Sequence, residues 1–467
     1  MCKAVATTSN LTAAQEKKST ASARKALNHA ASRPMERKPL VAAGAGFVKT
    51  VLVMAFSHAS LCALCVNVAF DLILWGLPAY ILLLPLSKRT FRRYMGGLIN
   101  YTTPIVFNLP MVLSGTTFHC DSLELLRQCK QTNALMLANH GSRIDWMMGM
   151  YVGYIADPFR ARVGFVCERV IQYMPLIGWY RKIVCEDVFV DRSFKVDKIN
   201  ISANLNDFHD DNIERMLFLS PEGVVVDFGE RDMQYMQACR DFCMEFGVKP
   251  FDYVLTPRYK GQTVLVEHVK HGGTITSVTM AFVRDGKLLN CEMWSKERVI
   301  PDIYTLCAGL GGSPVHIFIN IEELNFKADS DIKTIMMQDY VRKDNLLREW
   351  HNLLKAGKLD EMKSRFTQFK SNFWSAQFVQ VLHGLQLYLF ASYFDVIPQL
   401  VRGVTYMFLF IAFSHTLGWI MNGTSMESVP FETGIKAVLM KLFHTKHKQD
   451  KKREAAVAAT AAKEKAS

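Results

Sequence analysis

Two long apolar stretches enclose a more polar middle region. Residues 51–86 are almost continuously apolar, interrupted mainly by a few polar residues and by Gly76-Leu77-Pro78. Residues 373–394 and 399–420 form a second apolar pair, joined by a short polar turn. A helix needs about 20 apolar residues to cross a membrane. The first stretch is therefore long for one crossing and short for two, whereas the second has the length of two crossings.

Basic residues flank both apolar stretches, and the cytosolic loops of membrane proteins carry an excess of Lys and Arg. This pattern predicts an N-terminal membrane segment at residues 50–88, either a hairpin or re-entrant pair with both ends in the cytosol, or a single tilted span. It also predicts a C-terminal membrane hairpin at residues 371–421. Residues 1–49, rich in Ala, Ser, Thr, Lys and Arg, are expected to form a disordered basic tail, and residues 422–467 a basic cytosolic tail.

The middle region, residues 89–370, alternates short apolar runs with helical patterns. This alternation predicts a single α/β domain with a largely buried sheet, flanked by the N- and C-terminal membrane hairpins. The runs expected to form strands are Ala134–Leu137, Val163–Val166, Met216–Leu219, Val254–Thr256, Thr274–Phe282 and Val315–Ile319. Residues 331–359 combine charges with apolar positions three and four apart, which predicts a pair of surface helices.

Composition strengthens the membrane interpretation. Half of the 467 residues are hydrophobic and the formal net charge is +12. A basic balance suits nucleic acid, anionic lipid headgroups or polyanionic small substrates. The chain has no Cys/His finger spacing and no aromatic–basic strand motif, so nucleic acid is not expected as a partner. The histidines do not cluster with Cys or carboxylates at ligand spacing, so no metal site is predicted.

The strongest chemical signal is His140 followed five positions later by Asp145. The apolar run 134–137 and the turn residues after it place His140 in a loop and Asp145 in the first turn of the next helix. The carboxylate can then reach back to the imidazole, which is the pairing that a general base needs. Backbone N–H groups after Gly141 or at the helix start are candidate oxyanion donors, and Ser142 is expected to cap the helix. Taken alone, this spacing fits a solvated loop whose His and Asp never meet.

Two further blocks place charged residues at the ends of expected strands. Arg192 ends the run that begins at Val188, and a surface ion pair with Asp191 or Asp197 is the alternative interpretation. Glu222 follows a strand that stops at Pro221, where ligands of open α/β sheets bind, although an ordinary turn would have the same residues.

The last blocks add a second candidate phosphate ligand and a candidate lipid contact. The run from Val254 to Arg258 repeats the strand-then-charge design, with Arg258 available for a phosphate. A tight turn between Pro175 and Gly178 presents Trp179 as a surface that could meet lipid.

Together these blocks resemble the lysophospholipid acyltransferase family, the PlsC-like or 1-acylglycerol-3-phosphate acyltransferase superfamily. Asn139-His140 with Asp145 matches its N-H-x-x-x-x-D block, and Pro221-Glu222-Gly223 matches the start of its third block. The second block is represented by Pro175, Gly178, Trp179 and residues 189–192. Val-Leu-Thr-Pro-Arg at residues 254–258 is similar to the eukaryotic branch that includes the lysocardiolipin acyltransferases. The resemblance covers about residues 90–320.

The resemblance implies transfer of an acyl chain from acyl-CoA, as co-substrate and without other cofactor, to a free glycerol hydroxyl of a lysophospholipid. The implied catalytic residues are His140 and Asp145. The implied substrate-binding residues are Asn139, Arg143, Arg192, Pro221, Glu222, Gly223 and Arg258, with Glu222 holding acceptor hydroxyls and arginines holding phosphates. The expected partners are acyl-CoA, a lysophospholipid and the membrane. The expected place is the endoplasmic reticulum membrane with the domain facing the cytosol, with mitochondria-associated membrane as the alternative.

The chain departs from the family at one informative position. Val224-Val225 stands where the family usually continues Pro-Glu-Gly with Thr-Arg. In the family that arginine is taken to help hold the acceptor phosphate, so lysophosphatidic acid is in doubt as the acceptor. Arg231, Arg192 and Arg258 are the candidates to replace it. The alternative function is a catalytically silent relative that binds lipid or shapes the membrane.

Overall fold

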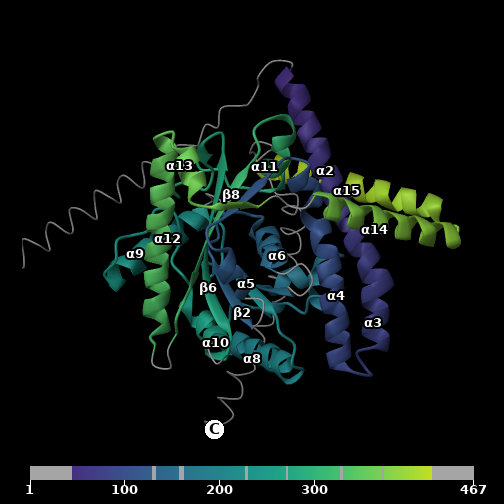
Figure 1. Cartoon of the computed structure of the whole chain (residues 1–467), viewed down its shortest axis with the longest axis horizontal. Coiled ribbons are helices and arrows are strands. Elements are labelled where there is room, and N and C mark those ends of the chain that lie inside the picture. The colour runs from purple at the N-terminus through teal and green to yellow at the C-terminus, as the bar shows by residue number, and fades with distance from the viewer. Residues whose placement is uncertain are drawn as a thin grey trace, which may run out of the picture. The chain divides into compact units, whose positions relative to one another are not determined.

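The computed structural model describes residues 45–422 except 129–132, 157–161, 227–229, 270–271, 327–329 and 370–372. The residues from Val48 onwards belong to one compact unit (Figure 1). The predicted tails, residues 1–49 and 422–467, lie outside the described residues except at their inner ends. There the first helix begins at Ala45 and the last helix ends at Asn422.

Helices make up most of the described chain. The α-helices are α2 (Ala45–Asp71), α3 (Leu77–Leu82), α4 (Lys88–Phe107), α5 (Leu123–Gln128), α6 (Asp145–Ala156), α7 (Ile177–Ile183), α8 (Phe194–Asp210), α9 (Glu230–Phe246), α10 (Tyr259–Val269), α11 (Ile303–Cys307), α12 (Ile332–Lys355), α13 (Leu359–Ser364), α14 (Phe373–Tyr393) and α15 (Ile397–Asn422). The π-helical turns are η1 (Leu72–Gly76) and η2 (Asn108–Val112), and the 3₁₀ helices are η3 (Arg169–Tyr173) and η4 (Ala308–Gly311).

One mixed sheet lies at the centre of the fold. Its strands are β1 (Thr117–Cys120), β2 (Ala134–Ala138), β3 (Val163–Glu168), β4 (Val188–Val190), β5 (Met216–Leu219), β6 (Thr274–Arg284), β7 (Lys287–Leu288), β8 (His316–Glu323) and β9 (Thr367–Phe369). They follow the order β4-β3-β5-β2-β6-β8-β1-β9, with β7 paired to β6. The five strands from β4 to β6 are parallel, so their carboxyl ends share one edge. The predicted α/β class with a central sheet is confirmed.

The sheet is buried on both faces, as its apolar runs predict. All five residues of β2 are buried. Met136 faces a core built with α6, whereas Leu135 and Leu137 face a second core that includes Trp350 of α12. Successive side chains of a strand point to opposite faces, so a strand covered on both sides reads as a continuous apolar run rather than an alternating one.

One expected strand is wrong. Residues 254–256 are buried but form a loop, and the backbone N–H of Leu255 donates to the Glu222 carboxylate instead of to a neighbouring strand. The expected surface helices form as α12 and α13. In α12, Gln338, Asn345 and Glu349 are exposed, whereas Trp350 and Lys343 are fully buried against the sheet. Apolar positions three and four apart thus form the face that covers the sheet.

The N-terminal apolar stretch does not form the predicted hairpin. It is one helical run from Lys49 to Leu82, 34 residues long, which among the described residues is the only helix long and apolar enough to cross a membrane. The helix continues through Pro78 because the π-helical turn η1 precedes it and Pro78 falls in the first turn of α3, where its missing N–H costs little. The single-span alternative therefore fits this geometry, and the crossing itself stays a prediction.

The C-terminal apolar pair forms two helices, α14 and α15, joined by a short turn after Tyr393 (Figure 1). The two helices pack against each other, as the hairpin prediction requires. Its membrane crossing stays a prediction. Within α15 the described apolar part runs from Ile397 to Phe413.

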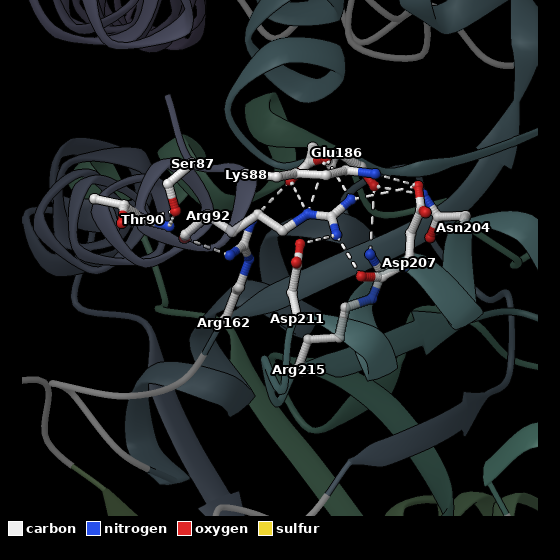
Figure 2. A network of polar contacts seen from close by, with 10 residues as sticks. All are labelled: Ser87, Lys88, Thr90, Arg92, Arg162, Glu186, Asn204, Asp207, Asp211 and Arg215. Carbon is white, nitrogen blue, oxygen red and sulfur yellow. Dashed lines mark hydrogen bonds and ion pairs between the residues drawn. The ribbon is translucent and has the colours of Figure 1, made fainter. Parts of the chain in front are cut away.

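A buried arginine fastens α4 to the domain (Figure 2). Arg92 is 1% exposed, and its Nε and Nη2 each lie 3.0 Å from the Glu186 carboxylate, while Nη1 lies 2.5 Å from Oδ2 of Asp211. Its guanidinium also lies 4.1 Å from the centre of the Phe208 ring, and Arg215 lies as close to the same ring. Arg215 immediately precedes β5, so this cluster lies at the amino ends of the parallel strands.

Candidate active site

The candidate catalytic turn leaves the carboxyl end of β2. His140 follows the strand in a loop, and Asp145 is the first residue of α6. The Nδ1 atom of His140 lies 2.8 Å from Oδ2 of Asp145, with the Asp145 side chain 3% exposed and the His140 side chain 26% exposed. The predicted contact between the two side chains is therefore present. The loop interpretation, in which they never meet, is wrong.

Further hydrogen bonds hold Asp145 in place. Its Oδ1 accepts from the Ser142 hydroxyl, and its Oδ2 also accepts from the Ser142 backbone N–H at 3.3 Å. The Ser142 hydroxyl in turn accepts from the N–H of Ile144, so this serine orients Asp145 as well as ordering the turn before the helix. Because a carboxylate can only accept, Nδ1 of His140 carries the hydrogen. Its Nε2 lone pair is left to take a proton.

Asn139 is a positioning residue in this structure rather than a substrate ligand. Its amide nitrogen donates to the carbonyl of Met280 at 3.1 Å, and its amide oxygen accepts from the N–H of Met280 at 2.7 Å. The side chain is 2% exposed. Both polar groups of the amide are therefore engaged by β6, and the residue ties the end of β2 to that strand.

Glu222 also departs from its expected role. Its two carboxylate oxygens accept from the backbone N–H groups of His140 at 2.9 Å and Leu255 at 3.2 Å, and the residue is 3% exposed. Burial raises the pKa of the Glu222 carboxyl, and the hydrogen bond from His140 opposes that rise. The carbonyl of Pro221 accepts from the N–H of Arg258 at 2.9 Å. The Pro-Glu-Gly turn thus joins the catalytic turn to the loop that carries Arg258, and its carboxylate is not placed to hold acceptor hydroxyls.

Two exposed arginines contact or closely approach Gly223. Arg192 donates from Nη2 to the carbonyl of Gly223 at 3.0 Å. Arg258 donates from Nε to the hydroxyl of Tyr235 at 3.0 Å, and its guanidinium lies over that ring. Gly223 has a φ of +71°, and a β-carbon there would lie 3.3 Å from the Arg258 side chain. A glycine is favoured at this position because of both its backbone conformation and this close approach.

The predicted alternative for Arg192, an ion pair with Asp191 or Asp197, is not the arrangement found. Nε of Arg192 lies 3.5 Å from the Glu168 carboxylate. Asp191 instead pairs with Arg169 at 2.5 Å, and Asp197 accepts from the N–H of Asp191. Arg192 therefore presents a guanidinium at the end of β4, close to the Pro-Glu-Gly turn.

The remaining predicted residues have separate surroundings. Arg143 is half-buried, and its backbone N–H donates to the carbonyl of Pro301 at 2.9 Å. The side chain of Arg231 lies outside the described residues. Val224, which stands in place of the family's threonine, packs against a small apolar cluster that includes Leu255 and Met236.

Lys343 is a residue that motif reasoning missed. It is fully buried on α12, and its Nζ donates to the carbonyls of Leu137 at 2.6 Å and Val278 at 3.2 Å. Leu137 belongs to β2, the strand that leads into the catalytic turn. Asp339 pairs with it at 3.3 Å, while burial lowers the pKa of the Lys343 ammonium. Its local pattern is that of any amphipathic helix, so no sequence signal marks it. Among the described residues no group of three His, Cys, Asp or Glu is placed to hold a metal ion.

Comparison with known proteins finds similarity over this region. The family model described as Acyltransferase matches residues 118–261. The chain is 24% identical over 301 residues, 60% of this chain and 69% of the relative, to a probable 1-acyl-sn-glycerol-3-phosphate acyltransferase 5 of Arabidopsis thaliana.

Shorter matches involve two mouse proteins. One is 1-acyl-sn-glycerol-3-phosphate acyltransferase epsilon of Mus musculus, 26% identical over 151 residues, 32% of this chain and 40% of the relative. The other is lysocardiolipin acyltransferase 1 of Mus musculus, 26% identical over 150 residues, 31% of this chain and 37% of the relative. These two matches span less than half of each mouse protein. The family match contains His140, Asp145 and Arg258 and ends before Lys343.

Proposed function

We propose that this chain, a member of the PlsC-like lysophospholipid acyltransferase family through its acyltransferase domain at residues 118–261, transfers a fatty acyl group from acyl-CoA to a free glycerol hydroxyl of a lysophospholipid. The observation that carries the proposal is the buried Asp145 carboxylate 2.8 Å from Nδ1 of His140, at the carboxyl end of a central strand. That arrangement leaves Nε2 as the base of the pair.

In this mechanism His140 takes the proton of the acceptor hydroxyl as its oxygen attacks the thioester carbonyl. Asp145 holds the ring in the correct tautomer and stabilises the imidazolium that forms. Ser142 and Glu222 hold the two ends of this pair, one through the Asp145 carboxylate and the other through the backbone of His140. No covalent acyl-enzyme is required. We propose the cytosolic face of the endoplasmic reticulum membrane as the place of the reaction.

Arg192 and Arg258 are proposed to hold a substrate phosphate, in place of the arginine that Val225 replaces. Both guanidiniums are exposed beside Gly223, and Tyr235 orients Arg258 through its hydroxyl and its ring. A guanidinium matches the geometry of phosphate oxygens with paired N–H groups.

The test uses the full-length protein in nanodiscs with labelled acyl-CoA and a panel of lysophospholipids that includes lysophosphatidic acid. Transfer to at least one acceptor, with release of free CoA, is the expected result. Lipid binding by folded protein without transfer to any acceptor would contradict the proposal. That result would favour a catalytically silent lipid-binding relative, for which the loss of the family's Thr-Arg at residues 224–225 is the supporting observation.

Replacement of Arg258 by glutamine should raise KM for the phosphate-bearing substrate by about 10-fold, which corresponds to about 1.4 kcal/mol. The reason is the loss of a positioned guanidinium that binds substrate but does not belong to the His140–Asp145 pair. Arg258→Lys should recover little, because an ammonium cannot keep both the stacking on Tyr235 and paired N–H donors.

Initial rates against substrate concentration measure this effect, with Lys260→Gln as the control on the next exposed cation along the chain. An unchanged KM for both substrates in Arg258→Gln would show that the phosphate lies elsewhere.

A further inference from the structure

Most backbone N–H groups of the catalytic turn already have an acceptor. The N–H group of His140 donates to Glu222, that of Ser142 to Asp145 and that of Ile144 to the Ser142 hydroxyl. The N–H of Arg143 donates to Pro301. Attack on a thioester places a negative charge on the carbonyl oxygen, and that oxyanion needs hydrogen-bond donors. The expectation that the N–H groups following Gly141 supply them is therefore wrong for residues 142–144.

A segment outside the family match, residues 289–302, packs directly on this turn. Besides the bond from Arg143 to Pro301, Asn290 lies against Gly141, where a β-carbon would approach the Asn290 amide nitrogen to 2.8 Å. Asn290 is itself held by β6, since its amide oxygen accepts from the N–H of Phe282 at 3.0 Å. The segment is thus fixed beside the catalytic turn from two sides.

Arg298 is the buried cation of this segment. It is 9% exposed, and Nη1 donates to the carbonyl of Cys291. Among the residues that the structure describes, its Nε has no hydrogen-bond acceptor. A buried guanidinium with an N–H group lacking an acceptor is costly for the fold. Such a donor beside a reaction centre is what a developing negative charge requires.

The Arg298 guanidinium lies beside the part of the segment that touches the catalytic turn. Its Nη1 donates to the carbonyl of Cys291, the residue after Asn290, and Asn290 lies against Gly141. Burial lowers the pKa of its guanidinium, and Cys291, Glu222 and Asp145 are the groups that oppose this change. The last two are the carboxylates that hold His140. Two buried carboxylates around one histidine leave an excess of negative charge, and a buried arginine offsets part of it.

We infer that Arg298 is a further catalytic residue, whose guanidinium donates a hydrogen bond to the oxyanion of the tetrahedral intermediate; this rests on the proposed function. The acceptor hydroxyl oxygen bonds to the thioester carbon, its proton passes to Nε2 of His140, and the carbonyl π electrons move to the oxygen beside Arg298. Collapse re-forms the carbonyl and breaks the carbon–sulfur bond. The CoA thiolate leaves and takes the proton from His140.

A donor of this kind acts on the transition state and not on the bound substrates. Arg298→Ala should therefore lower kcat by about 10²–10³ while KM for both substrates stays within about twofold. Arg298→Lys should recover only part of kcat, because an ammonium at the end of a different stem does not reproduce the guanidinium N–H directions. Lys296→Ala, an exposed cation on the same segment, should leave kcat unchanged.

The decisive measurement is rescue of Arg298→Ala by guanidinium chloride at non-denaturing concentrations, with ammonium chloride as the salt control. The expected result is a rise in kcat that saturates with guanidinium and is absent with ammonium, while the melting temperature of the variant stays the same. An Arg298→Ala protein with the kcat of the unaltered chain overturns the inference and leaves the proposed function intact.

A purely structural role for Arg298 would give a different pattern. It predicts a fall in kcat that parallels a lower melting temperature or a raised KM and that guanidinium does not reverse, and this pattern also overturns the inference. If Arg298→Ala does not fold, Arg298→Met, which keeps most of the buried stem, replaces it in the same experiment. Absence of transfer by the unaltered protein overturns the proposed function, and the inference with it.

Discussion

His140→Ala should lower kcat/KM for acyl transfer by about 10²–10⁴, the contribution typical of a positioned general base. The geometry explains the size of this loss. Among the described residues, Asp145 hydrogen-bonds only to the turn itself, through Nδ1 of His140 and both polar groups of Ser142, so its carboxylate acts through the imidazole that the substitution removes. Binding of lysophospholipid should persist, because the exposed arginines beside Gly223 are untouched.

The measurement is initial-rate transfer in nanodiscs, beside His209→Ala, a control at an exposed histidine of α8. Asp145→Asn should also be slow, since an amide can present its NH₂ to Nδ1 and stabilise the wrong tautomer. Undiminished activity in His140→Ala would contradict the assignment of His140 as the base and leave the buried His–Asp pair with a structural role only.

Arg92→Met should lower the free energy of unfolding by about 3–5 kcal/mol, the usual result of removing one partner from a buried ion cluster. The side chain is 1% exposed and satisfies the carboxylates of Glu186 and Asp211 at once (Figure 2). Its loss leaves both acids short of a partner and also removes the guanidinium from the face of Phe208. Since the cluster lies at the amino ends of β3 and β5, kcat of the folded fraction should change little.

Thermal and denaturant unfolding of the purified protein measure this effect, with Arg89→Met as the control because that arginine is exposed on the same helix. A double variant, Arg92→Met with Asp211→Asn, should recover part of the loss, because Asp211, left without Arg92 as its partner, is then neutral. A melting temperature for Arg92→Met equal to that of Arg89→Met would mean that the cluster contributes nothing to stability.

Local patterns predicted the parts of this protein whose contacts are local. The residues of β2 and β5 are apolar on both faces, and both strands lie at the positions of the apolar runs in the sequence. The pairing of His140 with Asp145 spans five positions, so the turn residues between them were enough to indicate it. The strand predicted at residues 254–256 is absent. An apolar run indicates burial, but a buried loop can satisfy its N–H groups by donating to a buried carboxylate, so burial alone does not indicate a strand.

Sequence by itself determined the α/β class, most strands of the central sheet, and the His140–Asp145 pair. Only the tertiary structure decided which distant groups support that pair. Glu222 bonds the backbone of His140 from 82 residues away, and Lys343 reaches the carbonyl of Leu137 from 206 residues away. Arg92, at the other end of the sheet, is likewise a buried charge whose partners, Glu186 and Asp211, come from distant parts of the chain. Such side chains carry no periodic signal, because a buried charge is defined by what surrounds it, and chain folding alone brings those surroundings together.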